Sequence, residues 1–568
     1  MTRIFVLLLI LFLSECLAGK SNVKNTSDEW NKFANAFLQD YFIKHPDFAV
    51  GQGRHEFDGK LPDFSEAGLQ ANLLWLNTER EKALAFNQKQ LDKHQQFERD
   101  YLIAQIDKDI FWQKIMDYPH INPNFYFDML DPDVYASRPY ATLQTRMRSY
   151  TIYLHNIPSA LQQIKATLKM PMIKIYVKAA RGSIHSLLSF YTSMLKNFEG
   201  IGDKEMMDEF KKANGEAVNA LNGFDTWLEG KENSSTGNYA FGIEKFSEML
   251  RMTEGVDISI DKLDSIGRAD LEQNTQALLK ECNKLAPGKT IAECLQIVSA
   301  NKVTGASLVD AVKNEVTRLR TFLQQKDIIS IFPAGDMKIA QSPPYRSWNP
   351  EYVNTPGPYD KNLLPVFYVS LPDPGWTKEK QNDYMPGKGN LSVICMHEAY
   401  TGHILQYLHS SRLASKFDQV FTDYAFAEGW ADYSQQMVCD AGYTFDDAGV
   451  RIEQLKDAIA KDIRLISAIG IHTRGMTIEE SKEMFIKNGF MDSATAQRQA
   501  NHGMIDPSYL NYAMGKLMIN KLRNDWISKN VQNNSWKKFH DLFLSFGSAP
   551  IPLIRKAMMG INDNSQLL

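Results

Sequence analysis

The sequence predicts a large, mainly α-helical protein with a small β-sheet. Apolar residues recur at helical spacing over most of the chain, as in EWNKFANAFLQDYF near the start and SLVDAVKNEVTRLRTFLQQ in the middle. Between residues 332 and 385 this spacing gives way to Pro, Gly, Tyr and Asn around short β-prone pieces such as DMKIAQ and LPVFYVSL. Helical spacing then returns from Leu391 onward. The irregular stretch therefore predicts a small sheet with long loops, which we expect to form the wall of a cleft.

The first residues predict a signal peptide. The run IFVLLLILFL spans only Ile4 to Leu13, whereas a membrane-spanning helix needs roughly 20 apolar residues. Ala18 is a plausible cleavage point, so we expect residues 1–18 to be removed and the mature chain to reach the periplasm or another extracytoplasmic space. Cys16 permits a lipoprotein interpretation, although Glu15 fits such processing poorly. Because no second long apolar run follows, no integral membrane segment is expected in the mature protein.

The change of pattern near residue 330 predicts an N-terminal helical lobe over 19–330 and a catalytic lobe over 331–568. The net charge is only -4 and no long basic or acidic tract occurs, which argues against a nucleic-acid partner. Four cysteines follow the signal peptide, too few for a disulfide scaffold. Cys282 and Cys294 flank KLAPGKT and either pair with each other or remain separate thiols. Nothing in the sequence indicates the oligomeric state.

The segment MHEAYTGH has the composition of a zinc site. Zinc catalysis needs neutral nitrogen ligands, a carboxylate ligand, a free position for water and a nearby base. His397 and His403 supply the nitrogens, and Glu398 is placed to take the proton of the water. The histidines are six residues apart and would diverge by about 120° on an ideal helix, so we expect a kink or bulge near Gly402. The alternative is an ordinary buried helix whose histidines make local hydrogen bonds.

A third ligand is available in AEGWADYSQQM. Glu428 and Asp432 are four residues apart and share one face of a helix. One carboxylate can therefore bind the metal while the other, Asp432, accepts a hydrogen bond from a ligand histidine. A solvated helix face is the alternative interpretation, but the flanking aromatic side chains indicate burial; they are Phe426, Trp430 and Tyr433.

HEAYTGH followed by EGWADY resembles the DUF885 family, which is itself similar to the helical, zinc-dependent gluzincin peptidases. Further segments share the resemblance over nearly the whole mature chain: HPDFAVGQGRHEFDGKLPDFS, VDISIDKLDSIG, IRLISAIGIHTRGMTIEES and PSYLNYAMGK. The family implies a helical fold split by a deep central cleft, with zinc at its floor. This chain has Thr401 and Ile404 where the family commonly has proline and histidine, so the kink lacks its proline.

The resemblance implies a set of site residues. It gives His397, His403 and Glu428 as zinc ligands, with Glu398 as general base. It also places Tyr512, Arg464 and His472 where the family has similar residues. A phenol suits a developing oxyanion, and we favour Tyr512 over Tyr509, three residues earlier, for that role; either tyrosine can instead be a packing residue. Arg464 and His472 either bind a substrate carboxylate or backbone, or pair with core carboxylates.

The sequence therefore predicts a zinc-dependent hydrolase, and first a peptidase that cleaves short peptides by metal-activated water. The same water and Lewis acid can act on any acyl carbon, so a zinc amidohydrolase or esterase with a small non-peptide substrate is an alternative. A third hypothesis is a catalytically silent binding protein. The intact Glu398 beside both histidines argues against it.

Overall fold

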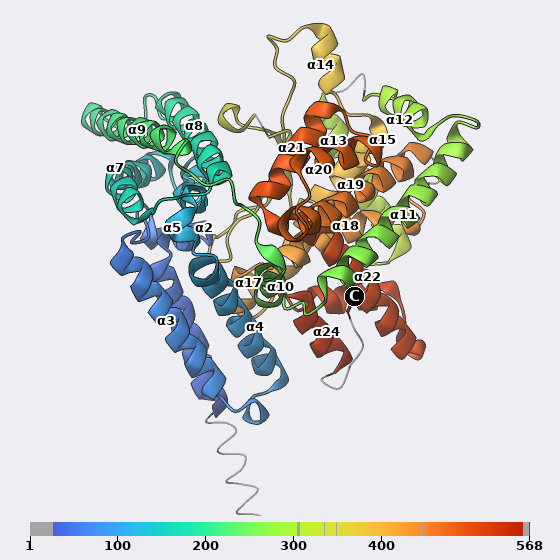
Figure 1. Cartoon of the computed structure of the whole chain (residues 1–568), viewed down its shortest axis with the longest axis horizontal. Coiled ribbons are helices and arrows are strands. Elements are labelled where there is room, and N and C mark those ends of the chain that lie inside the picture. The colour runs from blue at the N-terminus through green and yellow to red at the C-terminus, as the bar shows by residue number, and fades with distance from the viewer. Residues whose placement is uncertain (1–25, 304–306, 334, 348, 445–446, 561–566) are drawn as a thin grey trace, which may run out of the picture.

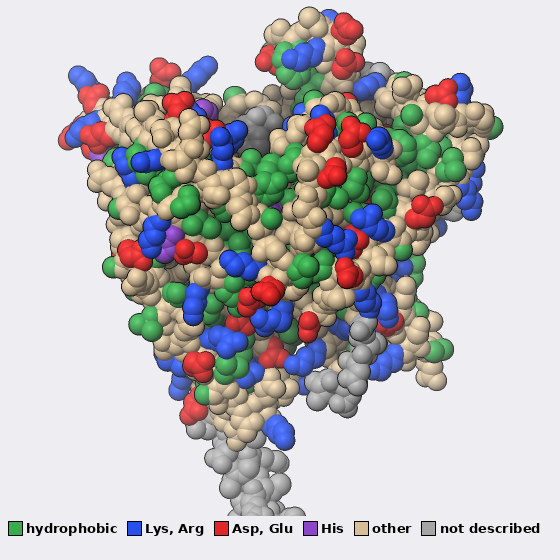
Figure 2. Space-filling view, viewed as in Figure 1, with side chains coloured by type: hydrophobic (Ala, Val, Ile, Leu, Met, Phe, Trp, Pro, Cys, Tyr) green, Lys and Arg blue, Asp and Glu red, His purple; other side chains and the backbone are tan. Residues whose placement is uncertain are grey.

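Helices make up most of the computed structural model, and a single small sheet accompanies them, as predicted. The structure describes residues 26–303, 307–333, 335–347, 349–444, 447–560 and 567–568. The predicted signal peptide lies outside these residues. Over the described ranges, no helix combines the length and apolarity needed to cross a membrane. Basic and acidic side chains are intermixed over the face shown in Figure 2.

The first part of the chain forms two groups of helices (Figure 1). A helix over residues 26–44 is followed by the pair α3 and α4, which contact each other. The next long helices, α7 to α9, pack together around an apolar cluster of their own, with Tyr150, Leu161 and Phe224 inside it. The bounds of these elements are α2 (Pro46–Gly51), α3 (Glu66–Ala85), α4 (Lys93–Ile110), α5 (Tyr118–Ile121), α6 (Asp133–Ser137), α7 (Leu143–Thr167), α8 (Lys174–Asn197) and α9 (Lys204–Glu232).

Helix α19 (Ala448–Thr473) is central to the rest of the chain and is buried along almost its whole length. Helices α11, α15, α18, α21 and α22 all contact it. The bounds of the other helices are α10 (Gly242–Thr253), α11 (Ile260–Leu285), α12 (Ile291–Ala300), α13 (Leu308–Lys326), α14 (Lys378–Tyr384), α15 (Lys388–Glu398), α16 (His403–Ser410), α17 (Lys416–Val420), α18 (Tyr424–Asp440), α20 (Ile478–Lys487), α21 (Ser493–Ile505), α22 (Asn511–Lys529), α23 (Trp536–Leu544) and α24 (Ile551–Met559).

The small sheet lies in the stretch between residues 332 and 385, where the sequence predicts it. Strand β3 (Val366–Val369) is central, with β1 (Lys338–Gln341) parallel to it and β2 (Glu351–Asn354) antiparallel. The pieces DMKIAQ and LPVFYVSL become β1 and β3, whereas β2 had no strand signal of its own. Strand β2 contacts α15, so one edge of the sheet lies beside the histidine motif.

The largest apolar cluster contains side chains from both predicted lobes. Trp30, Leu102 and Leu263 belong to it, and so do Met396 and Ile519. The division of the mature chain near residue 330 therefore stays a prediction. A disulfide between Cys282 and Cys294 joins the end of α11 to α12, and the other two cysteines among the described residues, Cys395 and Cys439, are free and buried.

Two glycines allow α18 and α22 to approach closely. A Cβ atom built on Gly429 would lie 2.5 Å from the Cα of Gly515, and a Cβ on Gly515 would overlap the carbonyl oxygen of Ala425. Real Cβ atoms cannot approach a backbone so closely, so both positions need glycine. This contact fixes α18, which carries Glu428 and Asp432, against the core.

We predict that Gly515→Ala destabilises the protein, because the added methyl group forces α18 and α22 apart. Overpacking of this kind costs about 1–3 kcal/mol, so for a chain of this length we expect the Tm in a thermal-unfolding experiment to fall by about 1–3 °C. Gly215→Ala on α9, where nothing lies within 4 Å of the added atom, is the matched control and should leave the Tm unchanged or slightly higher. Equal Tm values for the two variants would contradict the close crossing.

Candidate metal centre

The helix that carries the histidines is broken between them. Helix α15 ends at Glu398 and α16 begins at His403, with the intervening backbone turned through Thr401 at φ 126°. The hydroxyl of Thr401 donates to the carbonyl of Met396 at 2.9 Å, and Trp430 Nε1 donates to the carbonyl of Thr401 at 2.9 Å. The predicted distortion near Gly402 is thus a complete break, rather than a bulge inside a continuous helix.

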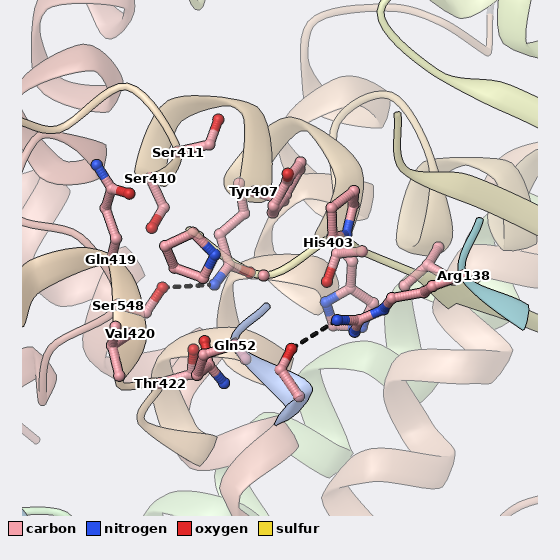
Figure 3. A pocket seen from close by; sticks show the side chains of 18 of the residues that line it. Gln52, Arg138, His403, Tyr407, Ser410, Ser411, Gln419, Val420, Thr422 and Ser548 are labelled. Carbon is pink, nitrogen blue, oxygen red and sulfur yellow. Dashed lines mark hydrogen bonds between the residues drawn. The ribbon is translucent and has the colours of Figure 1, made fainter. Parts of the chain in front are cut away.

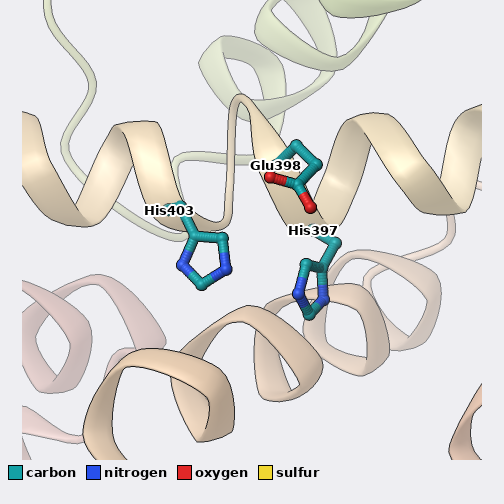
Figure 4. A group of neighbouring side chains, drawn as sticks. All are labelled: His397, Glu398 and His403. Carbon is teal, nitrogen blue, oxygen red and sulfur yellow. The ribbon is translucent and has the colours of Figure 1, made fainter. Parts of the chain in front are cut away.

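The break brings both imidazoles to the same side (Figure 4). The ring centroids of His397 and His403 are 4.9 Å apart and the rings are nearly perpendicular, at 89°. One ligand atom from each histidine and one from Glu398 lie within 4.8 Å of one another. The side chains in MHEAYTGH therefore converge as a metal site requires.

Glu428 on α18 completes the group. Its Oε2 atom lies 3.5 Å from His397 Nε2 and 3.6 Å from His403 Nε2. These distances are too long for hydrogen bonds, and this buried oxygen has no hydrogen-bond partner among the described residues. Zinc ligands at about 2.05 Å in a tetrahedral arrangement are about 3.4 Å apart. The Glu428 oxygen is therefore spaced from each imidazole nitrogen as two ligands of one zinc ion would be.

The other nitrogen of His397 faces a second pair of side chains on α18. Its Nδ1 lies 3.2 Å from Asp432 Oδ1 and 3.1 Å from Gln435 Nε2. A proton on Nδ1 directed at Asp432 leaves Nε2 as the lone-pair donor toward Glu428, which is the tautomer that metal binding needs, whereas a hydrogen bond donated by the Gln435 amide to Nδ1 goes with the opposite tautomer.

The charges of the site favour a bound cation. Burial opposes protonation of His397, but the carboxylates of Asp432 and Glu428 outweigh it and raise the pKa of His397 to about 10. Burial likewise opposes ionisation of Glu428, yet the two histidines hold its pKa well below the usual range. Without a metal, protons on the imidazoles supply the positive charge that these buried carboxylates require. A zinc ion supplies the same charge in their place.

Tyr512 and Arg464 lie beside the candidate metal ligands. The ring of Tyr512 is stacked 6.5 Å from that of His397, and the guanidinium of Arg464 lies 4.8 Å from the Tyr512 ring centroid. Lys461 lies over the same ring at 5.0 Å. Burial raises the pKa of Tyr512, so its phenol remains a proton donor at neutral pH.

Tyr509 and His472 lie deeper in the protein. Tyr509 is fully buried, packed against Gly503 and the ring of His502. The Nε2 atom of His472 lies 2.8 Å from the carbonyl oxygen of Gly503, and its ring packs against Phe241. These contacts connect both residues to α21 and the core rather than to the metal ligands, and their catalytic roles stay predictions.

Sequence reasoning missed several neighbours of the site. Gln435 lies seven residues after Glu428 and so on the same helical face, a signal that was available. Glu351 on β2 had no signal, because its strand was not recognised. Burial, followed by the charge of Glu398, raises the pKa of Glu351 to about 7, while His397 acts in the opposite direction. Glu351 therefore interacts electrostatically with both Glu398 and His397, although it is far from them in the sequence.

A cavity of about 380 Å³ adjoins the candidate ligands (Figure 3). His403 and Glu428 line it together with Val353 of β2. Arg138 lines it too, and its guanidinium donates to the carbonyl of Gly51 at 2.6 Å and to Asn354 Oδ1 at 3.2 Å. Two of the candidate ligands, His403 and Glu428, are thus accessible from a cavity with polar walls.

Comparison with known proteins supports the resemblance seen in the sequence. The family described as "Bacterial protein of unknown function (DUF885)" matches residues 46–558. The structure of a candidate lipoprotein of unknown function from Shewanella oneidensis is 21% identical, with a TM-score of 0.79 over 93% of this chain and 99% of that one. The crystal structure of a candidate lipoprotein from Colwellia psychrerythraea is 13% identical, with a TM-score of 0.80 over 95% and 100%. Both share the fold of this chain.

A third structure, of a candidate oligoendopeptidase F from Bacillus anthracis strain Ames, is 12% identical and covers 87% of this chain and 93% of its own. Its TM-score of 0.34 is too low to indicate a shared fold. No curated protein matches the sequence.

We predict that Gly402→Ala abolishes zinc binding. A Cβ at this position would overlap the carbonyl oxygen of His397, so the backbone must shift and separate the two histidines. We expect the zinc content, measured by elemental analysis after dialysis, to fall from about one ion per chain to a small fraction of that. Gly182→Ala on α8 has open space around the added atom and should keep its zinc. A Gly402→Ala variant with full zinc content would show that the break does not need glycine.

Proposed function

The chain belongs to the DUF885 family, and from its candidate metal centre we propose that it is a zinc-dependent peptidase acting on short peptides. The observation that carries this proposal is the position of Glu428 Oε2. This atom is buried, has no hydrogen-bond partner in the described part of the chain, and lies about equally far from the Nε2 atoms of His397 and His403. A resemblance to gluzincin peptidases is part of the same proposal. It is supported by the ligand types and by the base adjacent to the first histidine.

Zinc, when bound by His397, His403 and Glu428, lowers the pKa of a water molecule to about 7 and polarises a carbonyl group. Glu398 then acts as the general base: its carboxylate accepts the proton of the water and passes it to the leaving amine. Its carboxylate is placed for this, within 4.8 Å of both imidazoles. Asp432 holds the ring of His397 in the required tautomer and orientation.

The tetrahedral intermediate of peptide hydrolysis carries a negative oxygen that needs donors. Tyr512 is proposed for this role because its ring lies beside His397 and its phenol stays protonated. Arg464 acts through Tyr512, since its guanidinium lies against the tyrosine ring, and its Nε donates to Gln499 at 2.9 Å. These contacts fix the position of the ring and add positive charge near the oxyanion.

The cavity beside the ligands favours short peptides over folded proteins. Its volume of about 380 Å³ lies in the range of small-ligand sites and holds only a few residues. The proposal also places the mature protein outside the cytoplasm, because the predicted signal peptide directs export and the Cys282–Cys294 disulfide is typical of oxidising compartments.

The experiment that tests the function is incubation of the purified protein with a mixed peptide library, read by mass spectrometry. We expect cleavage of short peptides, loss of cleavage after removal of the metal with a chelator, and recovery when zinc is added back. Elemental analysis of the same preparation should give about one zinc per chain. Zinc without cleavage of any peptide would favour the small-amide hydrolase, and no zinc after gentle purification would favour the silent binding protein.

We predict that Glu398→Gln and Glu428→Gln have different effects. Glu398→Gln removes the base, so kcat should fall by about 10²–10⁴-fold while the zinc content stays near one per chain. Glu428→Gln removes a charged ligand, so the zinc content itself should fall. Activity assays paired with elemental analysis separate the two outcomes. If Glu398→Gln loses its zinc and Glu428→Gln keeps it, the two roles are reversed.

A further inference from the structure

A second cavity, of about 350 Å³, lies along α15 on the N-terminal side of His397. Asn390, Leu391 and Ile394 line it from the helix. Ile394 precedes Glu398 by four residues, so the two side chains share one face of α15. Strand β2, which contacts this helix, adds Glu351 to the lining. The cavity therefore adjoins the face of α15 that carries the proposed base.

Glu351 is a half-buried carboxylate without a partner. Within the described part of the chain, its carboxylate makes no hydrogen bond or ion pair. The lysines of the cavity are already engaged: Lys456 pairs with Glu453 at 3.1 Å, and Lys302 donates to two backbone carbonyls. Because a poorly solvated carboxylate without a partner is costly, this position favours a cation brought by a ligand.

Strand β2 passes both cavities. Glu351 and Val353 are two residues apart, so their side chains leave the same face of the strand, about 7 Å apart. Val353 lines the first cavity together with the zinc ligands His403 and Glu428. A peptide can therefore place its reacting carbonyl beside Glu398. The C-terminal part of the peptide then extends into the first cavity, and its N-terminal end points toward Glu351.

The α-ammonium group of a peptide suits this position because only one carbon atom separates it from the carbonyl of the first residue. A group that recognises it must lie close to the base that serves that carbonyl. Glu351 meets this condition, since it lines the cavity together with Ile394, whose side chain shares one face of α15 with Glu398. The ammonium of a lysine side chain is several carbon atoms further from the same carbonyl.

We infer that Glu351 binds the α-ammonium group of the peptide substrate, which makes the enzyme an aminopeptidase. The inference rests on the proposed peptidase function. In the reaction, water adds to the carbonyl carbon of the first residue and the bond from that carbon to the nitrogen of the second residue breaks. The proton held by Glu398 goes to this leaving nitrogen, so the products are one free amino acid and a peptide shortened by one residue.

The test compares two peptides of one sequence, with a free and with an acetylated N-terminus, on the zinc-loaded enzyme. We expect removal of the first residue from the free peptide and cleavage of the acetylated peptide at least about 10-fold more slowly. Glu351→Gln should lower kcat/KM for the free peptide by about 10- to 150-fold, the range for a lost charge-assisted hydrogen bond. It should change kcat/KM for the acetylated peptide by less than about twofold.

Asp383→Asn is the matched control, because it removes an exposed carboxylate from the lining of the same cavity. It should leave both rates unchanged, and all variants should keep their Tm. A third peptide, acetylated at its N-terminus and containing lysine, tests the other source of an ammonium group.

Several outcomes would overturn the inference. Equal cleavage of free and acetylated peptides would overturn it while leaving the peptidase proposal intact, and so would a Glu351→Gln effect confined to the lysine peptide. A second zinc ion in the wild-type enzyme that is lost in Glu351→Gln would make Glu351 a metal ligand instead. If the wild-type enzyme cleaves none of the three peptides, the peptidase proposal itself fails, and the inference fails with it.

Discussion

Two carboxylates on one face of α18 are held in the interior beneath two imidazoles, and much of the surrounding structure follows from that burial. Glu428 and Asp432 lie where water cannot solvate their charges fully, so each needs a positive neighbour or a metal. His397 faces both of them, with Nε2 toward Glu428 and Nδ1 toward Asp432. One ring therefore connects the two carboxylates, and its orientation determines which nitrogen is free to bind a metal.

Glycine makes this arrangement possible at two places. At Gly402 the backbone passes against the carbonyl of His397, which lets the chain leave α15 and begin α16 with both imidazoles on one side. At Gly429 and Gly515 the backbones of α18 and α22 touch, which sets the depth of the carboxylates. A side chain at any of these three positions would move the candidate ligands apart. The glycines therefore contribute to the site only by letting backbone segments approach closely.

The sequence was a good guide to the site wherever the signal was local. The motif MHEAYTGH and the spacing of Glu428 and Asp432 predicted a group of residues that the structure brings together, because helical periodicity decides which side chains share a face. The mainly helical fold followed from the same periodicity. Only two of the three strands had a recognisable signal, since the third, EYVN, lies between Pro350 and the turn-like TPGP, a context typical of a loop.

Contacts between segments that are distant in the sequence could not be predicted in this way. Glu351 and the cavity beside it depend on β2 packing against α15, and no local pattern reports such a contact. The same holds for Tyr509 and His472: their neighbours in the sequence resemble the family as closely as those of Tyr512 do, yet tertiary packing turns them toward α21 and the core. The ring of Tyr512, by contrast, lies 6.5 Å from that of the candidate ligand His397.

Behind Asp432, the charges continue to alternate into the core. Lys516 on α22 is buried, with Nζ 2.6 Å from Asp270 and 3.6 Å from Asp462. Burial opposes its charge, but the nearby carboxylates, Asp432 included, raise its pKa above the usual value. Lys516 thus has Asp270 and Asp462 as neighbours on one side and Asp432, beside the candidate metal centre, as a further acidic neighbour. The positive charge of Lys516 offsets part of the cost of burying these carboxyl groups in an otherwise apolar region.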